Sequence, residues 1–122
     1  MPIETLLARV ADEVTDLHVG VLARLAHNLR EEGWTCGDPV VVDYLRAGDV
    51  PERVLGLALV VASSDMVPAT PSSELRSFVD FLTWASAAHG ITFEFERDGH
   101  RVGRIADGAA SRVLLIGLVE AW

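Results

Sequence analysis

The longest uninterrupted apolar stretch of the chain covers residues 54–62 and reads V-L-G-L-A-L-V-V-A. It is apolar on every side, so it has no face to present to water in any regular structure. The preceding residues Asp49-Val50-Pro51-Glu52 have the form of a helix start: an Asp that can cap, a Pro suited to the first turn, and a Glu three residues after the Asp. We therefore expect a helix over about 51–63, buried at the centre of the fold. The stretch is too short to cross a membrane, which needs roughly 20 apolar residues.

Helical spacing of apolar residues predicts further helices on either side. A long amphipathic helix is expected over 3–32, ending at Gly33. A short helix is expected over 39–47, because Asp38-Pro39 resembles a helix start and Gly48 a stop. Another helix is expected over 71–89, closed by Gly90, after a linker over 64–70.

The segment 91–106 has a different period. Residues 91–96 alternate strictly between apolar and polar, and Asp98-Gly99 is a strong hairpin turn. Residues 101–106 form the expected return strand, with a bulge near Gly103 to correct the register. For 107–122 the pattern allows a third strand but favours a helix. The prediction is thus one α+β domain over 1–122, mainly helical, with four or five helices around the 51–63 helix and one β-hairpin at 91–106.

Composition narrows the possible chemistry. Half of the 122 residues are hydrophobic, as in a globular domain, and all ten positive side chains are Arg. The absence of lysine excludes Schiff-base and P-loop chemistry and indicates a GC-rich, bacterial or phage coding background. A single cysteine, Cys36, together with charged residues in the first apolar segment, predicts a cytoplasmic protein without a signal peptide or membrane anchor.

The net charge of −8 disfavours general nucleic-acid binding. Residues 97–112 are the exception, since they carry four Arg against two Asp. Nucleic-acid or anion binding through this hairpin is therefore an alternative, although pairing of these cations with Glu94 and Glu96 is the simpler interpretation. The residues of that possible anion site are Arg97, His100, Arg101 and Arg104.

The expected helix over 71–89 carries two apolar stripes where a surface helix needs one. The first is a core stripe, and the second lies roughly opposite, made up of Ser77, Phe81, Trp84 and Ala88. Aromatic residues are enriched at the centres of protein interfaces, so this second stripe is the candidate for partner binding. The function predicted from it is a non-enzymatic acidic protein that binds another protein or a second copy of itself, such as an adaptor, an inhibitor, or an immunity or antitoxin-like partner.

The alternative is a small enzyme or ligand-binding domain whose pocket gathers polar side chains from different elements. The candidates for such a pocket are His18, Cys36, Asp43, Tyr44 and His89. No catalytic residues, cofactor or metal are predicted, because the four His and one Cys have no spacing typical of a metal site. A helix-turn-helix over 39–63 is disfavoured because its second helix has no side chain that reads bases beyond Arg53.

Overall fold

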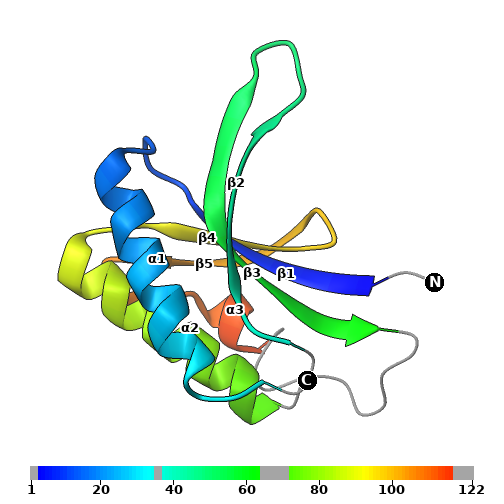
Figure 1. Cartoon of the computed structure of the whole chain (residues 1–122), viewed down its shortest axis with the longest axis vertical. Coiled ribbons are helices and arrows are strands. Elements are labelled where there is room, and N and C mark those ends of the chain that lie inside the picture. Colours follow the sequence, from blue (N-terminus) through cyan, green and yellow to red (C-terminus); the bar gives the residue numbers. More distant parts are fainter. Residues whose placement is uncertain (1–2, 35–36, 64–71, 117–122) are drawn as a thin grey trace.

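A computed structural model describes residues 3–34, 37–63 and 72–116 of the chain. Six strands form one sheet in the order β2-β3-β1-β4-β5-β6, and every neighbouring pair is antiparallel. The strands are β1 (Ile3–Val10), β2 (Val40–Arg46), β3 (Glu52–Ser63), β4 (Phe93–Arg97), β5 (His100–Ala106) and β6 (Ala109–Ala110). The helices α1 (Asp16–Arg30) and α2 (Ser72–His89) lie across one face of this sheet, as Figure 1 shows, and α3 (Arg112–Leu114) follows β6.

The core lies between this helical layer and the sheet. On β1 the even-numbered residues from Leu6 to Val10 are buried, while their odd-numbered neighbours are half-buried on the other face. Phe93 and Phe95 of β4 face the helices in the same way. The helices contribute the fully or nearly fully buried side chains Leu22, Leu25, Leu29, Leu75, Phe78, Val79, Leu82 and Ala85. We call the sheet face turned away from α1 and α2 the open face.

The hairpin of β2 and β3 extends beyond the rest of the sheet (Figure 1). Its register pairs Val40 with Ala58 and Arg46 with Glu52 without a bulge. The residues around its turn, 47–51, are all exposed. On the opposite side of the sheet, β6 is only two residues long and is held beside α2 by a 3.1 Å hydrogen bond from the Gly108 amide to Ser86 Oγ.

The prediction of a mainly helical domain is wrong. Residues 51–63, expected as the central helix, form the long strand β3, and Asp49-Val50-Pro51 belongs to the turn that precedes it. β3 lies between β2 and β1, and Leu55, Leu57 and Leu59 face the helices while Val54 is also buried. A short apolar run suits a buried strand as well as a helix, and here the strand pairs on both of its edges.

Two other predicted helices are also wrong in whole or in part. The segment 39–47 is the strand β2, as its three consecutive valines favour. The segment 3–32 is a strand followed by a helix, because the chain turns between Ala11 and Thr15 and α1 begins only at Asp16. The 107–122 segment contains the short β6 and α3 up to residue 116. The remainder of that segment, Cys36 and the whole of the predicted 64–70 linker lie outside the described residues.

The predictions for 71–106 are confirmed in outline. The helix α2 spans Ser72–His89, and Gly90 ends it at a positive φ of 67°. The turn residues Asp98 and Gly99 have φ values of 51° and 83°, as a tight two-residue hairpin requires. The register shifts between Phe95 and Glu96, so that Val102 is the extra residue opposite them, next to Gly103 where the bulge was predicted.

Candidate functional site

The outer side of α2 exposes the aromatic side chain that the sequence singled out. Trp84 is 61% exposed, and its ring meets His89 edge-on with ring centroids 6.0 Å apart. Phe81, one turn earlier, is half-buried and packs against the edge of the core. An exposed tryptophan at this position contributes little to the core, because most of its surface remains in water.

Trp84 and Phe81 form one wall of a groove between α1 and α2. The groove is an open hollow of about 440 Å³ lined by Leu25, Asn28, Asp80, Phe81 and Trp84. A second hollow of about 140 Å³ shares Leu25, Asn28 and Trp84 with it and adds Val21, Arg24 and His89. We call the two hollows together the α1–α2 groove. Its floor is apolar, and its charged residues lie on the rim.

The structure separates the four residues predicted for partner binding. Phe81 and Trp84 line the α1–α2 groove, whereas Ser77 lines a different hollow beside Trp34, and Ala88 is exposed near the end of α2. Sequence reasoning missed the contribution of α1, namely Leu25 and Asn28, and the acidic rim residue Asp80. The groove exists only because α1 and α2 lie side by side, and no periodicity within one helix reveals its neighbour.

The structure also places the described residues of the alternative pocket. His18 lies in the first turn of α1, where its Nδ1 accepts a 3.2 Å hydrogen bond from the Thr15 amide, and it is only half-buried. Asp43 and Tyr44 are consecutive residues of β2 and so face opposite sides of the sheet. Of the four, His89 alone lines the α1–α2 groove.

The arginines of the β4–β5 hairpin lie on both sides of the sheet. The register sets Arg97 against His100 on the helical side, and it sets Glu96 against Arg101 and Glu94 against Arg104 on the open face. Arg101 forms an ion pair with Glu94 at 3.5 Å. This contact agrees with the simpler interpretation of the segment, in which its cations pair with Glu94 and Glu96. The four residues of the possible anion site therefore do not share one face.

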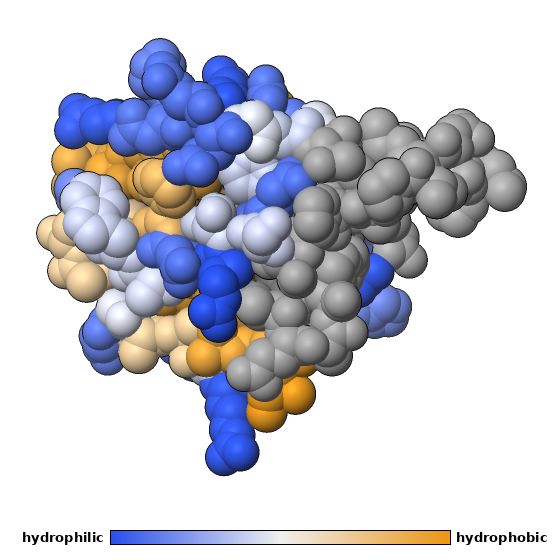
Figure 2. Space-filling model, turned by 90° about the horizontal axis from the view of Figure 1, so that it is seen from below, coloured by the Kyte–Doolittle hydropathy of each residue, from blue (hydrophilic) through white to orange (hydrophobic). Residues whose placement is uncertain are grey.

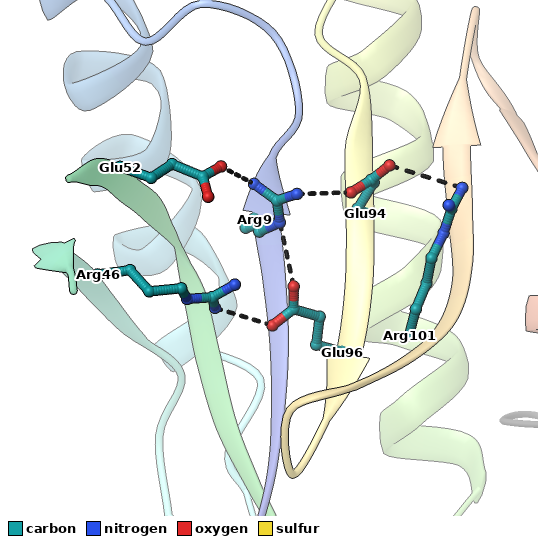
Figure 3. A network of polar contacts seen from close by, with 6 residues as sticks. All are labelled: Arg9, Arg46, Glu52, Glu94, Glu96 and Arg101. Atoms are coloured by element: carbon teal, nitrogen blue, oxygen red, sulfur yellow. Dashed lines mark hydrogen bonds and ion pairs between the residues drawn. The ribbon is translucent and has the colours of Figure 1, made fainter. Parts of the chain in front are cut away.

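The open face carries a network of charged side chains that the sequence did not reveal (Figure 3). At its centre, Arg9 of β1 contacts Glu52 at 3.0 Å and Glu94 at 2.8 Å. Arg9 Nε is buried and lies 3.1 Å from Glu96 Oε2 as an ion pair, without a hydrogen bond of good geometry. The side chains of Arg9, Glu94 and Glu96 are only 18%, 19% and 12% exposed, so they shield one another from water.

Arg46 of the edge strand β2 extends this network across the open face. Its guanidinium reaches Glu96 Oε1 at 3.0 Å, although β3 and β1 lie between β2 and β4. In a flat sheet the two residues would lie about 14 Å apart across the strands. They would also lie about 20 Å apart along the strands, because Arg46 pairs with Glu52 whereas Glu96 lies in the row of Ala58, six residues further along β3. The open face must therefore curve inward here to bring the two side chains together. The hydrogen bond to Glu96, and after it the one to Tyr44, raises the pKa of Arg46 further above its usual range.

A separate ion pair links the two strands of the β2–β3 hairpin. Arg53 donates from Nε to Asp43 Oδ1 at 3.0 Å and from a terminal nitrogen to Oδ2 at 2.8 Å. This two-pronged hydrogen bond lowers the pKa of Asp43 below its ordinary value and raises that of Arg53. Both side chains are about 40% exposed, so the pair fixes geometry more than it adds stability.

Within the described ranges, no group of three or more His, Cys, Asp or Glu side chains is arranged to hold a metal ion. Neither α1, α2 nor α3, as described, has the length and apolar character to cross a bilayer. In comparisons with known proteins, no family model, curated protein or solved structure matches this chain.

Proposed function

We propose that this protein is a protein-binding module, and that its α1–α2 groove receives an amphipathic helix of a partner protein. The observation that carries the proposal is the position of Trp84, which is 61% exposed on the wall of an apolar groove between two helices. A groove between two neighbouring helices suits a third helix, whose apolar ridge fills the space between the first two. Exposed tryptophans at such positions commonly carry a large share of binding energy.

The rim of the groove indicates the chemistry of the partner. Asp80 and Asn28 border the larger hollow, and the chain as a whole has a net charge of −8. A partner helix with Leu, Ile or Met at every third or fourth position and an Arg or Lys beside Asp80 therefore fits best. The single cysteine supports a reducing compartment such as the cytoplasm as the place where this binding occurs.

Site-specific photocrosslinking in cells tests this proposal. A photoreactive amino acid at Asn28, on the groove rim, is expected to capture a partner protein, whereas the same group at Val50, on the β2–β3 turn, is not. Trp84→Ala should weaken capture at least tenfold, because it removes the largest apolar contact of the groove. It should lower the free energy of unfolding by only about 1 kcal/mol, since little of the side chain is buried. Equal capture at both positions, or capture that Trp84→Ala leaves unchanged, would refute the proposal.

A further inference from the structure

The strand β2 has one edge without a partner in the part of the chain that the structure describes. It is the first strand in the sheet order and pairs with β3 alone. Between Val40 and Arg46 the strand contains no proline, and its register with β3 has no bulge, so two common protections of edge strands are absent there. Pro39, whose carbonyl accepts a 3.3 Å hydrogen bond from Arg30 Nε, marks where this free edge begins. The amide and carbonyl groups of every second residue along this edge point away from β3, where they can form hydrogen bonds with another strand.

The side chains of β2 are also unusually exposed for apolar residues in a sheet. Val40 and Tyr44, both on the open face, are 45% and 44% exposed, and Leu45 is 70% exposed. The hairpin extends away from α2, so no described helix covers this edge along its upper part (Figure 1). A strand laid beside β2 would cover both the backbone edge and these side chains.

We propose that the strand which pairs with β2 is β2 of a second copy, so that two sheets join into one across a two-fold axis at Val42. In an antiparallel pair centred on Val42, Tyr44 of one copy faces Val40 of the other. Each half-exposed apolar side chain thereby covers its counterpart. The paired segment runs from Val40 to Tyr44, and just beyond Pro39 the same register brings the side chain of Asp38 in one copy opposite Arg46 of the other, at both ends of the pairing.

Charge selects this register over the next possible one. Asp38 is exposed, and Arg46 keeps 39% of its side chain in contact with solvent while it bonds Glu96. A register centred on Asp43 would instead place two aspartates directly opposite each other and Arg46 against Val40. Like charges in directly opposed positions are unfavourable, whereas opposite charges stabilise the pair.

Engineered cysteines test both the dimer and its register. In a Cys36→Ser background, Val42→Cys is expected to give a disulfide-linked dimer under mild oxidation, because residue 42 faces itself across the axis. Tyr44→Cys alone should not link, since the two copies of residue 44 lie about 13 Å apart along the strands. A mixture of Val40→Cys and Tyr44→Cys chains should link to each other. Linkage through Tyr44→Cys but not through Val42→Cys would overturn the proposed register, and absence of all three links would overturn the dimer.

Light scattering during size-exclusion chromatography provides a test without cysteines. Asp38→Arg is expected to raise the dissociation constant of the dimer roughly tenfold, and added salt should relieve this effect because it screens the repulsion. Asp80→Arg makes the same change of charge on α2 and should leave the dimer intact, as should Trp84→Ala. A parent chain that stays monomeric at every concentration, or a dimer that Trp84→Ala dissociates and Asp38→Arg does not, would refute pairing through β2.

Discussion

At Gly56 the backbone of β1 comes too close to β3 to leave room for a Cβ, so substitution of this glycine tests the packing of the sheet directly. Gly56 lies on β3 opposite Arg9 of β1. A Cβ added to it would lie 2.8 Å from Arg9 Cα and 2.9 Å from the Ala8 carbonyl carbon, which are backbone atoms. β1 is paired with β3 on one side and with β4 on the other, so it cannot retreat without disturbing two ladders. We predict that Gly56→Ala destabilises the fold.

The size of the effect follows from two opposing terms. Forcing a methyl group into a packed site costs about 1–3 kcal/mol. Replacement of glycine by alanine also restricts the unfolded chain and returns about 0.5–1 kcal/mol. Here the clash is with backbone rather than with a flexible side chain, so the cost should lie at the upper end. We expect the free energy of unfolding to fall by about 2 kcal/mol.

Gly20→Ala provides a matched control on α1. A Cβ at Gly20 meets no atom within 4 Å, and the position is exposed within the helix. This variant should gain about 0.5–1 kcal/mol from helix propensity alone. Urea unfolding followed by far-ultraviolet circular dichroism measures both variants, and a loss of about 2 kcal/mol lowers the midpoint by about 1 M. A Gly56→Ala protein as stable as the parent, with the slope unchanged, would show that β1 and β3 are not so closely apposed.

Two further predictions concern the charged side chains. Arg9→Met should lower the free energy of unfolding, measured in urea, by about 2–3 kcal/mol, because it leaves two poorly solvated carboxylates of β4 without their central cation. Arg101→Met removes a largely exposed cation and should lower it by no more than about 0.5 kcal/mol. Equal losses in the two variants would contradict the central role of Arg9. Carbon-13 NMR titration should find the pKa of Asp43 below its ordinary value of 3.8, so the stability that this pair contributes is complete above that pH and disappears as the pH falls through the lowered pKa. Arg53→Met should return the titration of Asp43 to its ordinary range, and an Asp43 that titrates identically in both proteins would refute the pairing.

The sequence predicted α2 and the β4–β5 hairpin because each has a clear period and a clear end. The apolar positions of α2 recur at helical spacing and stop at Gly90, and the strict alternation of 91–96 leads into Asp98-Gly99. Local chemistry determines these elements. The core stripe of α2 is buried as expected, and Trp84 of its second stripe is exposed.

The sequence failed where the structure depends on pairing between distant segments. β3 is apolar from Val54 to Ala62, so it has no period that separates strand from helix. Of its two neighbours only β2 is adjacent in the chain, whereas β1 lies more than 40 residues earlier. In 3–32 the apolar positions of a strand happen to continue in phase with those of the following helix, which hid the turn between Ala11 and Thr15. The consecutive valines of 40–42 were the overlooked signal, since branched residues of this kind favour strands.

Only half of the candidate site was predicted, because its two walls come from segments distant in the chain. Phe81 and Trp84 stand out within one helix, but Leu25 in the opposite wall belongs to α1, which starts 56 residues before α2 in the chain. The network around Arg9 could not be foreseen, because its six members come from five strands whose order the sequence does not state.

The network around Arg9 also affects which contacts between molecules are open to this protein. Seen from the end opposite the projecting hairpin, the described surface shows hydrophobic residues in separate groups among hydrophilic ones rather than as one continuous area (Figure 2). On the open face, three arginines and three glutamates neutralise one another, so this network has no net charge with which to attract a second molecule. An apolar surface packed against it would also have to remove water from these charged groups, which is unfavourable. The charged residues of this network therefore oppose face-to-face stacking, the contact by which sheets pair in amyloid fibrils.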